Sequence, residues 1–135
     1  MARRTILVAD GSPMAILWAR MVLEAQGYEV ISALDGYEAV QRVRDDRPDL
    51  VILDVQLPLL NGLAACREIR AMPRARTLPV IILSTSSDSA TVLEAFQSGC
   101  SEFLLKPASV AELGARVRSH LPPQPPSSPP SSRRP

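Results

Sequence analysis

Short apolar runs alternate along the chain with longer segments in which apolar residues recur every three or four positions. The short runs predict buried strands, and the longer segments predict amphipathic helices. Five strand and helix pairs in alternation favour a parallel sheet with helices on both faces, because crossovers between parallel strands are right-handed. The predicted strands are 6–9, 28–33, 50–53, 80–83 and 102–105, and the predicted helices are 13–25, 36–47, 63–71, 90–98 and 110–121.

The first helical segment carries an apolar stripe that we expect to face the core. Pro13 suits the first turn of this helix, and Gly27 ends it. Trp18 lies on the stripe, so its side chain is expected to be buried. The residues of the predicted stripe are Met14, Leu17, Trp18, Met21, Val22 and Ala25.

Four of the predicted strands end at a polar residue. Asp10 follows ILVA, Asp54 follows LVIL, Ser84 follows VIIL and Lys106 follows FLL. The carboxyl ends of parallel strands meet at one edge of the sheet, which is where open α/β sheets bind ligands. Two carboxylates, a hydroxyl and an ammonium at that edge indicate a site for a divalent metal ion and a phosphoryl group.

Composition narrows the classes of partner. The chain has 135 residues, which is enough for one domain, and we place that domain at residues 1–121. This part holds 13 basic and 14 acidic residues, so its net charge of −1 gives no electrostatic case for binding nucleic acid. No signal-peptide core and no apolar run of about 20 residues is present, so we expect a cytoplasmic protein without a membrane partner.

The two cysteines, Cys66 and Cys100, stand 34 residues apart. This spacing does not form the paired motif of a zinc site or a redox dithiol. We expect both to be small, buried or half-buried thiols.

From Pro122 the composition changes to PPQPPSSPPSSRRP, with seven prolines and four serines in 14 residues. Such a segment has nothing to bury, and we expect residues 122–135 to be disordered and extended. It can be a solvated terminus or a docking peptide for a proline-recognition module.

The four polar residues match what phosphoryl transfer requires. The carboxylate of Asp54 can act as a nucleophile and form an acyl phosphate. Mg²⁺ prefers oxygen ligands, which Asp10, Asp54 and a backbone carbonyl near Gln56 would supply. Ser84 and Lys106 would donate a hydroxyl hydrogen bond and a positive charge to the phosphoryl oxygens.

The motifs ILVADGSP, DLVILDVQLPLLNG, LPVIILSTS and FLLKP together resemble the receiver domain of bacterial two-component response regulators. Asp10, Asp54, Ser84 and Lys106 follow one another at intervals of 44, 30 and 22 residues, in the order and spacing of that family. The resemblance covers roughly residues 4–121.

The resemblance implies a flavodoxin-like (βα)5 fold that accepts a phosphoryl group on Asp54 with Mg²⁺ bound. The donor would be a sensor histidine kinase or a phosphotransfer protein. The output would be a rearranged surface on the fourth helix, fifth strand and fifth helix, where a downstream protein binds. Ser84 and Phe103 match the two switch positions, although an aromatic residue such as Phe103 can also serve only the core. The Lys106-Pro107 peptide bond is expected to be cis.

Two departures from the family pattern affect the site. Gly11 stands where receivers usually have a second acidic residue that contacts the metal. Losing even an outer partner of a metal ligand costs about 10- to 100-fold in affinity, so we expect weak Mg²⁺ binding. Thr85 replaces a smaller residue, and its β-branched side chain is expected to narrow access to Asp54.

Three functions therefore remain open. The first is a stand-alone phosphoryl-accepting switch that does not turn over an external substrate. The second is a pseudo-receiver that docks other proteins independently of phosphorylation. The third is a small phosphatase with Asp54 as nucleophile, which is disfavoured because 135 residues leave no room for a cap or lid. His120, the only histidine, lies in a last helical turn where a cation favours the dipole, so a histidine kinase is excluded.

Overall fold

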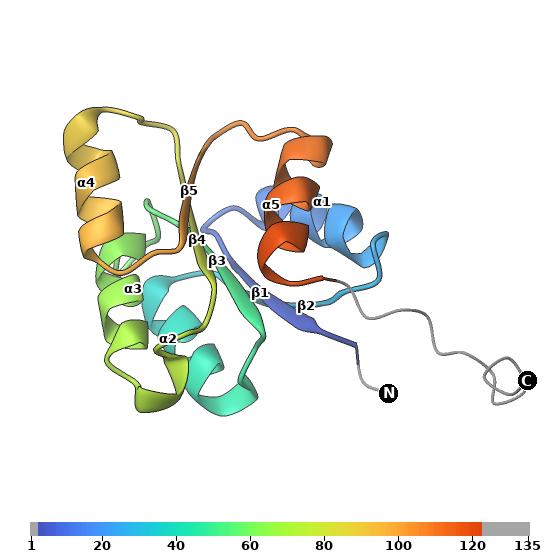
Figure 1. The fold of residues 1–135 in the computed structure, drawn as a ribbon, viewed down its shortest axis with the longest axis horizontal. Coiled ribbons are helices and arrows are strands. Elements are labelled where there is room, and N and C mark those ends of the chain that lie inside the picture. Colours follow the sequence, from blue (N-terminus) through green and yellow to red (C-terminus); the bar gives the residue numbers. More distant parts are fainter. Residues whose placement is uncertain (1–2, 123–135) are drawn as a thin grey trace, which may run out of the picture.

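A five-stranded parallel sheet lies between two layers of helices in the computed structural model, which describes residues 3–122 (Figure 1). The strand order β2-β1-β3-β4-β5 is that of the flavodoxin-like fold, so the predicted fold class is confirmed. The segment expected to be disordered lies outside the described residues, except for Pro122. The elements are β1 (Thr5–Ala9), α1 (Pro13–Glu24), β2 (Glu29–Ala33), α2 (Gly36–Asp46), β3 (Leu50–Asp54), α3 (Gly62–Arg70), η1 (Pro73–Ala75), β4 (Val80–Ser84), α4 (Ser89–Gln97), β5 (Glu102–Leu105) and α5 (Val110–His120).

The register of the strands brings their carboxyl ends to one level. Asp54, the last residue of β3, pairs with Leu83 of β4, and the neighbouring Ser84 pairs with Leu105 of β5. Beyond the paired residues, the Lys106 amide donates to the Ser84 carbonyl at 2.7 Å. The register therefore fixes the main chain on both sides of the predicted site.

Side chains alternate between the two faces of the sheet and form two separate cores. In β1, Leu7 and Ala9 point to one face, whereas Ile6 and Val8 point to the other. We call the half that is covered by α2, α3 and α4 the α2–α3 side, and the half that is covered by α1 and α5 the α1–α5 side (Figure 1). Every residue of β3 is buried, as expected for a central strand packed on both faces.

Each α-helix begins at a polar residue whose side chain accepts a hydrogen bond from a backbone amide in the first turn. Such caps satisfy amides that would otherwise lack a partner and stabilise a helix by about 1 kcal/mol each. None of the helices within residues 3–122 is long and apolar enough to cross a membrane. The capping residues are Ser12, Asp35, Asn61, Asp88 and Ser109.

The predicted orientation of α1 is wrong. Of the predicted stripe only Val22 is buried, and Trp18 is 39% exposed. Apart from Arg20 and Glu24 the helix is apolar all round, so periodicity alone did not identify its inner face. The residues that α1 buries are Ile16, Ala19, Val22 and Leu23, and its exposed apolar residues are Met14, Leu17, Trp18 and Met21.

Arg70, near the end of α3, binds three separate segments of the α2–α3 side. Its Nη1 donates to the carbonyls of Ala75 and Leu78, at 2.7 and 2.5 Å, and its Nε donates to the Gly99 carbonyl at 2.7 Å. Its Nη2 is 3.2 Å from Ser101 Oγ. Neither this role nor the short 3₁₀ turn η1, which supplies one of the carbonyls, was predicted from the sequence.

Both cysteines are buried and free, as predicted. Burial raises the pKa of the Cys66 thiol, and it raises the pKa of Cys100 to about 12. Both thiols therefore remain protonated at neutral pH and act as small core side chains.

Candidate functional site

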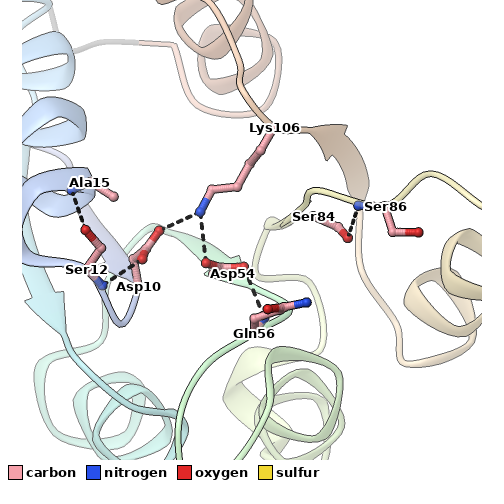
Figure 2. A network of polar contacts seen from close by, with 8 residues as sticks. All are labelled: Asp10, Ser12, Ala15, Asp54, Gln56, Ser84, Ser86 and Lys106. Carbon is pink, nitrogen blue, oxygen red and sulfur yellow. Dashed lines mark hydrogen bonds and ion pairs between the residues drawn. The ribbon is translucent and has the colours of Figure 1, made fainter.

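Three of the predicted site residues meet at the carboxyl edge of the sheet (Figure 2). The Nζ atom of Lys106 lies 2.8 Å from Asp10 Oδ2 and 2.8 Å from Asp54 Oδ2. Asp10 follows β1, Asp54 ends β3 and Lys106 follows β5. The ammonium therefore bridges two carboxylates that come from the adjacent strands β1 and β3.

The site is largely shielded from solvent. Asp10 is 6% exposed and Asp54 is 8% exposed. Burial by itself would lower the pKa of Lys106, but hydrogen bonds to Asp10 and Asp54 and their negative charges outweigh it, so the pKa is raised. Lys106 is consequently a cation at neutral pH.

The second oxygen of each carboxylate accepts a backbone hydrogen bond. Asp10 Oδ1 accepts from the Ser12 amide at 2.9 Å, and Asp54 Oδ1 accepts from the Gln56 amide at 3.0 Å. These bonds fix both carboxylates in place. They also keep Gln56, whose carbonyl is the predicted third metal ligand, next to Asp54 (Figure 2).

The donor set suits Mg²⁺. This ion is commonly held by one or two carboxylates and keeps several of its own waters. Asp10 and Asp54 supply two carboxylates, and the carbonyl of Gln56 supplies a further hard oxygen. Within residues 3–122 there is no group of three or more His, Cys, Asp or Glu side chains placed to hold a metal ion.

Ser84 is buried but lies apart from the Lys106 ion pairs (Figure 2). Its Oγ accepts a hydrogen bond from the Ser86 amide at 3.0 Å. Ser86 Oγ in turn donates to Asp88 Oδ2 at 2.5 Å, and Asp88 caps α4. The hydrogen bonds from Ser86 and Thr91 lower the pKa of Asp88, so this carboxyl stays ionised.

A chain of hydrogen bonds thus links the edge of the sheet to the start of α4. The roles of Ser86 and Asp88 were not predicted from the sequence. The sequence LSTSSDS contains many possible caps, and only the folded backbone selects which hydroxyl meets which amide.

Phe103, the second predicted switch residue, is partly buried and packs against the core of the α2–α3 side. It pairs in register with Ile82 of β4. This position suits both of the roles considered for it, namely core packing and an aromatic switch.

Gly11 leaves little room for a larger residue. A Cβ atom at this position would lie 3.1 Å from Cδ of Pro58, in the loop that follows β3. An acidic side chain would therefore require the Pro58 ring to yield by a few tenths of an ångström. The other departure, Thr85, is exposed.

Two loops at the site have an unusual backbone conformation. The Lys106-Pro107 peptide bond is cis, as predicted. Leu59, in the loop after β3, is exposed and has a φ of 68°, which was not predicted. A leucine rarely adopts left-handed backbone, which costs about 1–2 kcal/mol.

The surface of α1 next to the site is apolar and exposed, which was not predicted. This helix begins three residues after Asp10. We call Met14, Leu17, Trp18 and Met21 the α1 stripe.

Comparison with known proteins places this site in a family. The response regulator receiver domain family matches residues 6–118. The DNA-binding response regulator MtrA of Mycolicibacterium smegmatis is 37% identical over 119 residues, which are 88% of this chain and 51% of that protein. MtrA of Mycobacterium leprae is 36% identical over 119 residues, 88% of this chain and 52% of that protein. The chain spans about half the length of these curated relatives.

Solved structures agree with this match. The chemotaxis protein CheY4 of Vibrio cholerae superposes with a TM-score of 0.85 at 27% identity, covering 89% of this chain and 100% of that chain. The receiver domain of the sensor histidine kinase PA1611 of Pseudomonas aeruginosa superposes with a TM-score of 0.82 at 31% identity, covering 88% and 98%. In that structure a magnesium ion is coordinated in the active site cleft.

Proposed function

Because the chain belongs to the response regulator receiver domain family, we propose that it is a signalling switch that accepts a phosphoryl group on Asp54. The observation that carries the proposal is the position of Lys106 Nζ, 2.8 Å from both Asp10 Oδ2 and Asp54 Oδ2. A nucleophilic carboxylate and a second carboxylate are thereby both held in contact with one cation.

Each residue has a defined part in the transfer. A carboxylate oxygen of Asp54 attacks the phosphorus in line, and the bond from phosphorus to the imidazole nitrogen of a phosphohistidine donor breaks. Lys106, already charged, turns from the Asp54 carboxylate to the phosphoryl oxygens. Mg²⁺ held by Asp10, Asp54 and the Gln56 carbonyl would neutralise the negative charge of the phosphoryl group. We expect this metal binding to be weak, because Gly11 supplies no carboxylate.

The switch would act through Ser84. When its hydroxyl turns to donate to a phosphoryl oxygen, the Ser86 amide loses the partner that it has at 3.0 Å. Ser86 binds the residue that caps α4, so the start of this helix responds. The apolar residues Leu93 and Phe96 of α4, Leu105 of β5 and Val110 of α5 are all exposed, and we propose that a downstream protein binds this α4-β5-α5 face.

The phosphoryl donor, a sensor histidine kinase or a phosphotransfer protein, would cover the rim of the site. The α1 stripe supports this, because it is an exposed apolar surface that begins next to the loop of Asp10. The MtrA relatives are named as DNA-binding response regulators, but those proteins are about twice as long as the segment that matches this chain. With a net charge of −1 over residues 1–121, we expect no DNA binding by this part of the chain. We also expect no turnover of an external phosphoester, because the chain accepts the phosphoryl group on its own Asp54.

The direct test is to add Mg²⁺ and beryllofluoride, which mimics a phosphoryl group, and to follow backbone amide shifts by NMR. We expect shifts at Ser84, Ser86 and the first turn of α4, and acetyl phosphate should add one phosphoryl mass. Asp54→Asn is the control and should abolish both responses. Unchanged spectra at tens of millimolar Mg²⁺ would contradict the proposal.

A second candidate function is favoured by Gly11: a docking module that works without phosphorylation. Its test compares Gly11→Asp with Gly11→Asn, which has nearly the same volume and no charge. If only Gly11→Asp accepts a phosphoryl group and the natural chain does not, the natural chain is not a phosphoryl switch, which favours the docking function. If the natural chain is phosphorylated and Gly11→Asp merely lowers the Mg²⁺ it requires, the switch stands.

A further inference from the structure

A cavity of about 320 Å³ lies between α1 and α5, beside the ion pairs of the site. Its walls are almost entirely apolar, and small residues create the space. Ala15 and Ala19 are one helical turn apart on α1, and Ala108 faces them from the loop before α5. Trp18 and Pro107 also line the cavity and are exposed, so it opens to the surface. Val8, Ala9, Ile52, Leu83 and Leu113 complete its apolar lining.

Asp10 and Lys106 are the only ionisable groups in this lining. Lys106 Nζ already binds two carboxylates, so an anionic ligand in the cavity would be repelled by Asp10, and a cationic ligand would be repelled by Lys106. A ligand without net charge avoids both repulsions. Each Asp10 oxygen accepts one hydrogen bond, at 2.9 and 2.8 Å, and a carboxylate oxygen can accept two. The Asp10 carboxylate can therefore accept two more in all, and one donor of a ligand can use either position.

We propose that this cavity binds a small, uncharged aromatic molecule that carries one O–H or N–H donor. Ligand sites are typically apolar clefts of about 300–1,000 Å³ with a few polar groups that orient the ligand, and this cavity is at the small end of that range. The Trp18 indole offers an aromatic surface for stacking. The donor of the ligand would bond to Asp10.

The experiment uses the full chain without Mg²⁺ or a phosphodonor, so its result is independent of the proposed phosphoryl chemistry. The probe is 4-ethylphenol, followed by NMR at the amides of Ala15, Ala19 and Ala108 and at the indole N–H of Trp18. We expect saturable shifts confined to the cavity lining, with a dissociation constant of about 1 mM or below. No saturable shift at the lining, or shifts scattered over the surface, would overturn the proposal.

Two related probes test the chemistry. Ethylbenzene lacks the donor and should bind about three- to tenfold more weakly than 4-ethylphenol, which corresponds to one hydrogen bond. The 4-ethylbenzoate ion has a similar body with a negative charge and should not bind detectably. Equal binding by all three probes would contradict the role of Asp10.

Cavity-filling variants test the location. Ala108→Phe should abolish the shifts, whereas Ala115→Phe, at an exposed position of α5, should leave them unchanged. If Ala108→Phe does not fold, Ala15→Leu narrows the cavity from the α1 side and should weaken binding at least about tenfold, the effect of roughly 1.4 kcal/mol. Unaltered affinity in a folded filling variant would show that the ligand binds elsewhere.

Discussion

The two sides of the sheet use small residues in opposite ways. On the α2–α3 side, a Cβ atom at Gly36 would overlap the Leu60 carbonyl oxygen, and a Cβ atom at Gly62 would overlap that of Asp54. On the α1–α5 side, Ala15, Ala19 and Ala108 are among the residues that line a cavity of about 320 Å³. Small side chains therefore permit contact between backbones on one side and leave space on the other.

The difference follows from what each side must hold. Gly62 donates to the Val55 carbonyl at 2.9 Å, which brings the start of α3 against the loop that carries Asp54. Arg70 adds four polar contacts at the opposite end of α3. On the α1–α5 side the polar contacts lie near the C-terminal ends of the helices, where Arg118 donates to Gln26 Oε1 at 2.9 Å and the Tyr28 hydroxyl donates to the Leu121 carbonyl. The cavity lies toward the other end, beside Ala15 and Ala108. The main chain that carries Asp54 thus rests against the tightly packed side, and the cavity lies on the loosely packed one.

The largest expected effect is that of Gly62→Ala. The added methyl group meets the backbone of Asp54 and Val55 and not a flexible side chain, so the loop must shift. We expect the free energy of unfolding to fall by about 3 kcal/mol, measured by chemical denaturation. Gly11→Ala is the matched control, because its Cβ would meet only the Pro58 ring at 3.1 Å. A similar small loss in both variants would show that the α2–α3 side is not tightly packed.

A pair of identical substitutions compares the two sides directly. Ala65→Leu inserts three carbons into the fully buried α2–α3 side and should cost about 2 kcal/mol. Ala15→Leu extends into the cavity and should stabilise the protein by about 1 kcal/mol, because it buries apolar surface without displacing a neighbour. Thermal unfolding of both variants measures the difference. Effects of the same sign would remove the contrast between the sides.

Lys106→Met tests the ion pairs with Asp10 and Asp54 at the carboxyl edge of the sheet, which borders both sides. It leaves Asp10 and Asp54 facing each other without a cation, and we expect a loss of about 1–2 kcal/mol, between the values for exposed and buried ion pairs. The pKa of Lys106 is raised above its ordinary value of 10.5, so this stabilisation is complete below that pH and is lost as pH rises through the raised pKa. Denaturation at neutral and strongly alkaline pH should therefore show the two proteins converging at high pH. A constant difference across that range would contradict the role of the ammonium.

Much of this architecture could be predicted from the sequence. Strand runs that stop at Asp10, Asp54 and Lys106 are local signals, and a parallel sheet necessarily brings strand ends together. The convergence of these residues at one edge therefore followed from the parallel sheet, whereas the 2.8 Å contacts depend on the side-chain conformation of Lys106. Arg70 was not predictable, because its carbonyl partners lie up to 29 residues away along the chain.

The orientation of α1 was missed for a different reason. An apolar pattern identifies the buried face of a helix only when the other face is polar. In α1 the outward face is also apolar, so two stripes compete, and Trp18 with Met21 formed the more prominent one. An exposed apolar face of this kind conflicts with the rule used to find the core, and such conflicts are expected where a surface binds a partner.

The smallest expected effect concerns this outward face of the α1–α5 side. Met21 is 66% exposed and its neighbour Val22 is 8% exposed, although both belong to the stripe that the sequence predicted to be buried. Met21→Gln exchanges one good helix former for another at the surface, and we expect the free energy of unfolding to change by less than about 0.5 kcal/mol. Val22→Gln buries an amide in the apolar core and should cost about 2 kcal/mol or more. Equal costs in chemical denaturation would place Met21 in the core. A neutral Met21→Gln that also slows phosphorylation by a kinase would instead assign the α1 stripe to donor binding, because the change leaves the fold and Asp54 intact.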